Sequence, residues 1–149
     1  MPSLFNPADA QVYINRIARL TPSSQAQWGK MNVTQMLIHT QGPLKVALGE
    51  MKLKRGMMGI LFGGIAKRQI LKPGPLRRNT PTAPEFMVFD ASGFETSRNQ
   101  LIDLVERFTK AGPAGISQDP HPFFGKLTAA EWDTMQWKHL EHHLSQFGV

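Results

Sequence analysis

The chain has 149 residues, of which 41% are hydrophobic and 19% are charged, and it contains no cysteine. This is the composition of an ordinary globular protein, long enough for one domain with a buried core, and it argues against the disordered and fibrous classes. The lack of cysteine excludes disulfides, a thiolate nucleophile and cysteine-ligated zinc, so any metal ion would be held by His, Asp or Glu.

The positive charge is concentrated in one segment. The net charge is +6, and eight of the seventeen basic residues lie between positions 52 and 78: Lys52, Lys54, Arg55, Lys67, Arg68, Lys72, Arg77 and Arg78. A field of this sign attracts nucleic acid, anionic lipid or an acidic small molecule, although a solvated basic loop has the same pattern. Nucleic acid is the less favoured partner, because aromatic residues suited to base stacking are scarce near the basic segment. Phe62 and Phe86 are the nearest.

The first predicted helix covers residues 7–20. Asn6 is a suitable N-cap and Pro7 occupies the first helical position, where a missing N–H costs nothing. The N-terminal stretch lacks a basic region followed by an apolar run of about 7 to 15 residues, so it does not read as a signal peptide. We therefore expect a cytoplasmic protein.

The second predicted helix covers residues 32–49. Asn32 and Gln35 are in capping-box register at its start. Pro43 lies inside it and provides no N–H for the carbonyl of His39, so we expect the helix to kink or loosen there.

A long insert, residues 49–92, follows the second helix. Bundle connections usually have about 2 to 8 residues, so this one is expected to have structure or function of its own. Its stretch RGMMGILFGGIAKR contains about ten apolar residues, far fewer than the ~20 that cross a bilayer. We expect a short helix or an extended segment that packs across the bundle, and no transmembrane segment.

The third predicted helix covers residues 93–111, with Ser92 and Glu95 in capping-box register. An apolar stripe along one side of this segment supports the assignment. Its end is marked by a Gly-Pro pair, which is typical of a helix stop.

The fourth predicted helix covers residues 128–147 and begins with a capping-box pair, Thr128 and Glu131. Four amphipathic helices without alternating strand patterns indicate an all-α protein, a four-helix bundle with a long insert between helices two and three. The whole chain is expected to be one domain.

Three of the five histidines lie in the last predicted helix, within WKHLEHHLSQF. At 100° per residue, His139 and His143 face its apolar side about 40° apart, whereas His142 lies at the border of the polar side. The polar arc of this helix consists of Thr134, Lys138, Glu141 and Ser145.

Two imidazoles at positions i and i+4 of one helix face are able to bind one divalent ion. His39, on the flank of the apolar side of helix two, is the candidate third ligand for His139 and His143. Three histidine ligands leave a coordination position open for water or substrate, as in catalytic sites, and nickel, zinc and iron all accept imidazole. The alternative is that these histidines are hydrogen-bonded core residues without a metal.

Five further polar residues are candidates for supporting roles. His121, before the last helix, suits a capping or loop role and is also a candidate for the mouth of the site. His142 and Glu141 suit either a solvated surface or the orientation of the ligands from outside. Gln136 and Gln146 are candidates for orienting the ligands from within the core.

The stretches MNVTQMLIHT and HPFFGKLTAAEWDTMQWKHLEHHLSQFGV resemble the DinB/YfiT-like four-helix-bundle superfamily, specifically a subfamily with this HPFFG-to-HHLxQF ending. The resemblance covers nearly the whole chain. It implies that one histidine of the second helix and an HxxxH pair of the last helix bind a divalent metal, often nickel or zinc. These positions correspond to His39, His139 and His143.

The resemblance also implies a function: a metal-dependent enzyme that activates a low-molecular-weight thiol or water, of the thiol transferase, thiol-dependent isomerase or metal hydrolase type. A small-molecule substrate follows from this, and a homodimer is a further expectation, since many members of the superfamily are dimers. The basic insert departs from the simplest bundles. An alternative is therefore a non-catalytic binding module that uses the insert to dock an anionic partner.

Overall fold

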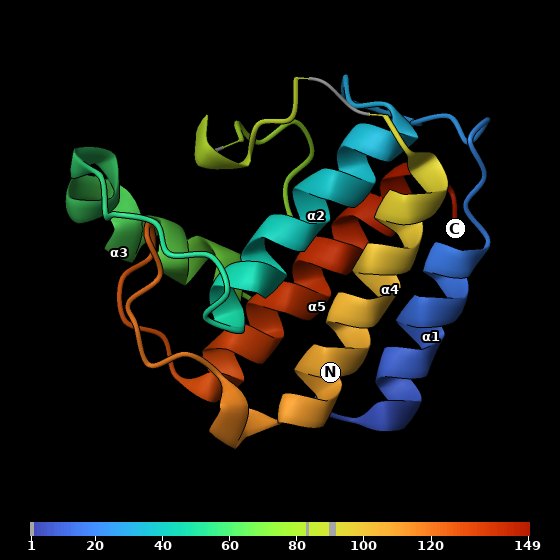
Figure 1. Cartoon of the computed structure of the whole chain (residues 1–149). Coiled ribbons are helices and arrows are strands. Elements are labelled where there is room, and N and C mark those ends of the chain that lie inside the picture. The colour runs from blue at the N-terminus through green and yellow to red at the C-terminus, as the bar shows by residue number, and fades with distance from the viewer. Residues whose placement is uncertain (1, 83, 90–91) are drawn as a thin grey trace.

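The computed structural model describes residues 2–82, 84–89 and 92–149. Within these ranges the chain forms five α-helices and no β-strand, so it is all-helical, as predicted. The helices in Figure 1 are α1 Pro7–Ala18, α2 Val33–Ala47, α3 Met57–Leu71, α4 Phe94–Ala111 and α5 Ala129–Gln146. Two single-turn 3₁₀ helices, η1 and η2, cover Pro84–Phe86 and Pro113–Gly115.

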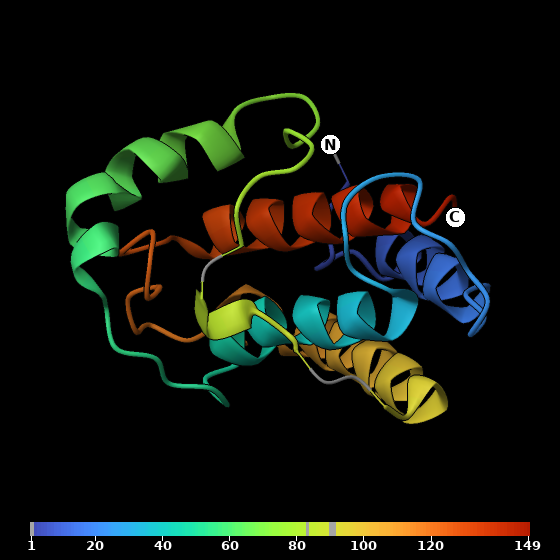
Figure 2. The ribbon, with the colours of Figure 1, turned by 90° about the horizontal axis from the view of Figure 1, so that it is seen from above.

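Four of the helices lie side by side and enclose the core. α2 contacts α4 and α5, and α1 contacts the same two helices. Large apolar side chains from all four are fully buried between them, among them Ile17, Leu37, Leu104 and Leu140. α3 lies to one side of this group, where it contacts α5 (Figure 2).

Three of the predicted helix starts are confirmed. The Asn6 side chain accepts backbone N–H groups of the first turn of α1. Asn32 and Gln35 form a reciprocal capping box on α2, and Thr128 and Glu131 form another on α5. Each box satisfies N–H groups that have no partner within the helix, so these sequence signals fix where the two helices begin.

The predicted capping box of α4 is wrong. The residue that precedes the helix is Gly93, with φ 77° and ψ 57°, and it makes no side-chain cap. This left-handed conformation is one that glycine adopts without steric cost, and it leaves Ser92 one residue too far from the helix to cap it. The Glu95 carboxylate instead accepts from Arg98, at 2.5 Å.

α2 runs without interruption through Pro43, so the predicted loosening near His39 does not break the helix. The helix ends at Ala47, two residues before the predicted end at position 49. Gly49 has φ 74°, and the N–H of Glu50 donates to the carbonyl of Lys45 at 2.9 Å. A left-handed glycine after the last turn is a common helix stop.

Two residues of the polar arc of α5, Lys138 and Glu141, bind other parts of the chain. Lys138 is buried, and its Nζ donates to the carbonyl oxygens of Ile70 and Lys72, at 2.7 and 2.6 Å. A cation at this end of α3 satisfies free carbonyls and complements the helix dipole. On the same arc, Glu141 forms an ion pair with Arg16 of α1 at 2.5 Å.

The insert contains a helix of fifteen residues, α3, which is longer than the short element that the sequence predicts. Besides the contact through Lys138, an ion pair between Lys67 and Glu131 joins α3 to the start of α5, at 2.8 Å. None of the helices in the described ranges combines the length and the apolar character needed to cross a bilayer.

Candidate metal centre

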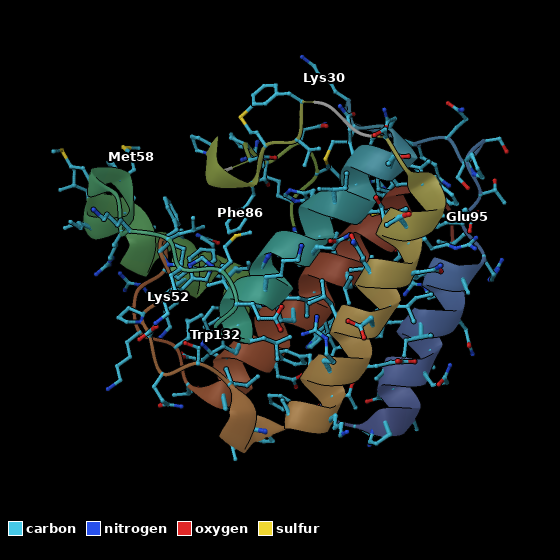
Figure 3. The ribbon with its side chains drawn as sticks, in the orientation of Figure 1. Lys30, Lys52, Met58, Phe86, Glu95 and Trp132 are labelled. Atoms are coloured by element: carbon cyan, nitrogen blue, oxygen red, sulfur yellow. The ribbon has the colours of Figure 1, made fainter. Side chains whose placement is uncertain are left out.

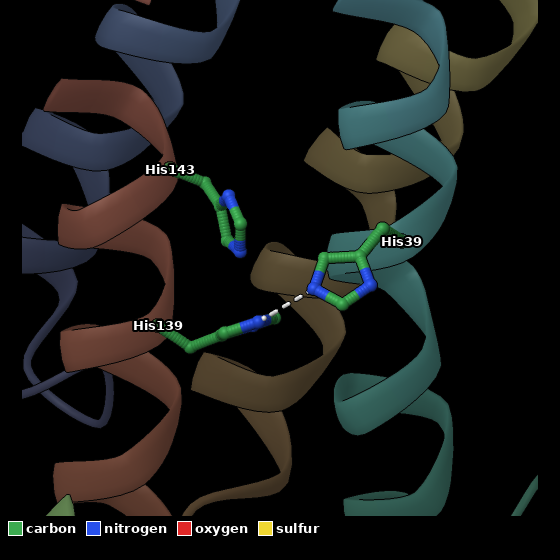
Figure 4. Close-up of side chains that lie close together, drawn as sticks. All are labelled: His39, His139 and His143. Carbon is green, nitrogen blue, oxygen red and sulfur yellow. Dashed lines mark hydrogen bonds between the residues drawn. The ribbon is translucent and has the colours of Figure 1, made fainter. Parts of the chain in front are cut away.

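Three histidines meet between α2 and α5. His39 comes from α2, and His139 and His143 come from successive turns of α5 (Figure 4). Their candidate ligand atoms all lie within 4.8 Å of one another, and the Nε2 atoms of His39 and His139 are 3.0 Å apart. His39 and His143 are buried, and His139 is partly buried. The structure thus brings together the three residues that the sequence predicts as ligands.

The tautomer of His39 follows from its hydrogen bond. Nδ1 of this ring lies 3.0 Å from the backbone oxygen of Phe86, in η1. A carbonyl oxygen only accepts, so Nδ1 carries the proton and Nε2 keeps its lone pair. Metal-binding histidines commonly donate their other N–H to a carbonyl in this way. The insert therefore orients a ring that belongs to α2.

The tautomer of His143 follows from a chain of two hydrogen bonds. Nε2 of Gln146 donates to the backbone oxygen of Trp28 at 2.6 Å, which fixes the orientation of the amide. Oε1 of Gln146 then faces Nδ1 of His143 at 2.9 Å. Nδ1 has to be the donor, so Nε2 of His143 also keeps its lone pair. The predicted role of Gln146 in orienting a candidate ligand is consistent with this geometry.

These tautomers test whether the residues fit a metal ion. With a lone pair on His39 Nε2, the 3.0 Å contact with His139 Nε2 needs a proton or a cation between the two nitrogens. A proton on His139 satisfies the contact, and a divalent ion replacing that proton does so too. Three neutral imidazole nitrogens are a donor set suited to nickel, zinc or iron, so the residues fit the predicted group.

Burial keeps the three rings in the form that binds metal. Desolvation lowers the pKa of His39, and it lowers the pKa of His143 to about 3, with the nearby His39 charge as the next cause. Desolvation also holds the pKa of His139 well below its usual range, and the charges of the other two rings lower it further. The imidazoles are therefore neutral at pH 7, and neutral imidazole is the ligating form.

Comparison with known proteins places almost the whole chain in one family. Residues 5–148 match the family described as "Protein of unknown function (DUF1569)". The chain belongs to this family. Neither the curated proteins nor the solved structures gave a match. The family match supports an all-helical domain, in agreement with the five helices, and it names no activity.

His142, the remaining histidine of α5 in this DUF1569 chain, lies outside the cluster of His39, His139 and His143. It is half-buried, and its pKa is lowered by burial and then by the charge of Arg78. The Arg78 guanidinium carbon lies 4.0 Å from the centre of the Trp28 ring, and that ring meets His142 edge-on at 5.9 Å. The insert and the loop after α1 therefore cover part of His142, which is not a fully solvated surface residue. Glu141, paired with Arg16, is not a free surface group either.

His121 has the loop role that the sequence favours. Its Nδ1 accepts the backbone N–H groups of Phe123 and Phe124, at 3.0 and 3.1 Å. Its ring is buried against Phe124 and Trp132, and burial lowers its pKa to about 4. The neutral ring thus holds the turn before α5, and it does not belong to the histidine cluster.

The hydrogen bond of the Gln136 side chain goes to the backbone of α2 and not to the clustered histidines. Its Nε2 donates to the carbonyl oxygen of Pro43 at 3.0 Å, so it joins α5 to α2 within the core. A cavity of about 340 Å³ lies near this end of α2, lined by residues of segments 46–55 and 117–122. The three clustered histidines do not line it, so the cavity and the cluster are separate features of the molecule.

Sequence reasoning missed the contributions of Phe86, Trp28 and Arg78 to the surroundings of the cluster. Phe86 and Trp28 bind His39 and Gln146 through backbone oxygens, which every residue carries, so no sequence signal could have identified these two contacts. Arg78 belongs to the basic segment that the sequence does single out. Its position over an indole ring depends on the path of the insert.

Proposed function

We propose that this chain is a divalent-metal-dependent enzyme of the DinB/YfiT type. In this proposal α1, α2, α4 and α5 are the four-helix bundle of a single domain covering residues 1–149, and residues 49–92 are its insert. His39, His139 and His143 hold nickel, zinc or iron. The observation that carries the proposal is the convergence of three neutral imidazoles whose Nδ1 atoms, in two cases, are bound by hydrogen bonds.

The number of ligands supports a catalytic role over a structural one. Structural zinc sites usually have four protein ligands, whereas three protein ligands leave a position for water or substrate. When bound, such an ion lowers the pKa of a water or thiol so that it becomes a nucleophile at neutral pH. The Phe86 carbonyl and the Gln146 amide contribute by holding the rings of His39 and His143 in one orientation.

The reaction class rests on the superfamily resemblance. The proposed substrates are a small electrophilic molecule and a low-molecular-weight thiol or water, which corresponds to a thiol transferase or a hydrolase. A homodimer belongs to the same proposal.

Metal analysis of the protein, purified without an affinity tag, tests the proposal. We expect about one divalent ion per chain in the unmodified protein and little in His143→Ala, because the loss of one of three ligands lowers affinity strongly. His121→Ala is the matched control, since it also removes a buried histidine but lies outside the cluster. Equal and negligible metal in the unmodified protein and His143→Ala would refute the proposal.

A second measurement addresses the open position. Cobalt(II) loaded into the protein has a visible spectrum that depends on its ligands. A low-molecular-weight thiol should change this spectrum if a coordination position is free, and the change should be absent in His143→Ala. An unchanged spectrum in the loaded protein would favour a closed, structural site.

A further inference from the structure

α3 packs with its smallest residues inward. Gly59 and Gly63, one turn apart, are its buried residues, and they lie against the backbone of Pro122 and Phe123. A Cβ atom added to Gly63 would stand 2.1 Å from the Phe123 carbonyl oxygen, and one added to Gly59 would stand 2.8 Å from that of Pro122. Only glycine permits this approach, so the glycine face is the side of α3 that packs against the rest of the protein.

Most of the large apolar residues of α3 consequently point away from the rest of the molecule. Six of them are between 47% and 76% exposed: Met57, Met58, Ile60, Leu61, Phe62 and Ile65. Figure 3 shows Met58 at the outer edge of the structure. A contiguous exposed apolar surface of this kind marks an interaction site more often than a scatter of single exposed residues does.

One stripe of α3 joins this apolar surface to positive charge. Met57, Leu61 and Ile65 are spaced at i, i+4 and i+8, opposite the glycine face, and Arg68 and Lys72 continue the same line. Arg68 and Lys72 are exposed. The outer side of α3 is therefore apolar in its first half and basic at its end.

The charge of the surrounding segment has one sign. Residues 51–84 contain eight of the seventeen basic residues and none of the eleven acidic ones, a net charge of +8. The remainder of the chain has nine basic and eleven acidic residues, a net charge of −2. The excess positive charge of the protein therefore lies in the segment that carries its exposed apolar surface.

These two properties select the kind of partner. A second copy of the chain meeting α3 through the same face would bring two segments of like charge together, which is unfavourable. Nucleic acid would match the charge but would leave Met57, Leu61 and Ile65 uncovered. An anionic lipid surface matches both, because its phosphates attract Lys and Arg and its acyl region takes up apolar side chains.

We propose that α3 docks the protein on membranes that contain anionic phospholipids. Met57, Leu61 and Ile65 enter the boundary between headgroups and acyl chains, and Arg68 and Lys72 contact lipid phosphates. With fifteen residues, α3 is too short to span a bilayer and lies in its surface. This docking is independent of the proposed metal chemistry and requires no ion at the histidines.

Vesicle flotation of the full-length chain tests this. We expect binding to equimolar phosphatidylcholine–phosphatidylglycerol vesicles and little binding to pure phosphatidylcholine. The triple variant Met57→Gln/Leu61→Gln/Ile65→Gln should bind at least about tenfold more weakly. Because each basic residue contributes about fivefold near an anionic surface, Arg68→Gln/Lys72→Gln should weaken binding about 25-fold.

Matched controls separate docking from general effects. Val12→Gln removes an exposed apolar residue of α1, and Lys30→Gln/Lys110→Gln removes two exposed charges elsewhere, so both should bind like the unmodified chain. In Leu61→Trp the new indole should be quenched by brominated lipids, and in Val12→Trp it should not. Circular dichroism checks that each variant keeps its helices.

Three results would overturn the proposal. The first is equal binding of neutral and anionic vesicles, and the second is full binding by both α3 variants. The third is the absence of vesicle binding together with a dimer, seen by light scattering, that the triple apolar variant abolishes; this would assign the face to a second copy. None of these readouts depends on metal, so failure here leaves the metal proposal untouched.

Discussion

α2 and α3 have the same length and opposite relations to the core. Each has fifteen residues, but eleven residues of α2 are buried, compared with two residues of α3. α3 nevertheless has the more apolar sequence, since nine of its residues are Ala, Ile, Leu, Met or Phe. Apolar content therefore does not decide which helix enters the core of this protein. The residues that face the neighbouring backbone decide it, and in α3 these are glycines.

Replacing a leucine by alanine should change the free energy of unfolding strongly in α2 and very little in α3. Leu37→Ala, at a fully buried position of α2, is expected to lower the free energy of unfolding by about 2 to 5 kcal/mol through lost burial and a cavity. Leu61→Ala, at a position of α3 that is 63% exposed, should change it by about 0.5 kcal/mol or less. Urea denaturation of both variants measures the difference, and similar losses would show that α3 belongs to the cooperative core.

Acid should weaken the turn on which α3 rests. The pKa of His121 is about 4 when folded and 6.5 as the ordinary value, so its stabilising effect is complete above pH 6.5 and is lost as the pH falls toward 4. At about 1.4 kcal/mol per pH unit, this gap corresponds to about 3 kcal/mol.

The comparison variant is His121→Asn, which keeps an acceptor for the backbone N–H groups but does not titrate. Its stability should fall less than that of the unmodified chain between pH 7 and pH 4, by up to the amount given above, in urea denaturation at each pH. Parallel pH profiles would mean that His121 is not held neutral in the folded protein.

Metal binding should stabilise the protein through α2 and α5, and not through α3. Added nickel or zinc should stabilise the metal-free protein by about 2.7 kcal/mol at a hundredfold excess over Kd. His39→Ala, in α2, and His139→Ala, in α5, should each remove most of this gain, whereas His142→Ala should keep it. Melting temperatures with and without metal are the measurement. The reverse ranking would place the site on another face of α5.

The smallest expected effect concerns the packing of α3 against the rest of the protein. Gly63→Ala places a Cβ atom against the Phe123 carbonyl and should weaken the packing of α3 against the protein by about 1 to 3 kcal/mol. Gly64→Ala, next to it, meets nothing within 4 Å and should stabilise the helix by about 0.5 to 1 kcal/mol.

Hydrogen exchange of α3 amides and trypsin cleavage within residues 52–78 report the two changes. Both should increase in Gly63→Ala and decrease slightly in Gly64→Ala, while the amides of α2 stay protected in both variants. Equal exchange in the two variants would remove the glycine face as the explanation for the orientation of α3.

The features that could be predicted from the sequence are those that depend on neighbours along the chain. The caps at Asn6, Asn32 and Thr128 are local hydrogen bonds, and the pairing of His139 with His143 follows from the helical repeat. The all-helical class follows from the same periodicities. The Ser92 capping box failed because the pattern did not reveal that Gly93 adopts a left-handed conformation.

The groups that complete the candidate site and the exposed face of α3 depend on contacts between distant segments, so they could not be predicted from the sequence. The Phe86 carbonyl that orients His39 is 47 residues away in the chain, and a backbone atom leaves no mark in a sequence. The sequence places Lys138 on the polar side of α5, whereas in the structure the end of α3 covers it and accepts its hydrogen bonds. The glycine face of α3 acquires its meaning only from the backbone at Phe123, because close packing is a property of two surfaces and a sequence pattern describes one.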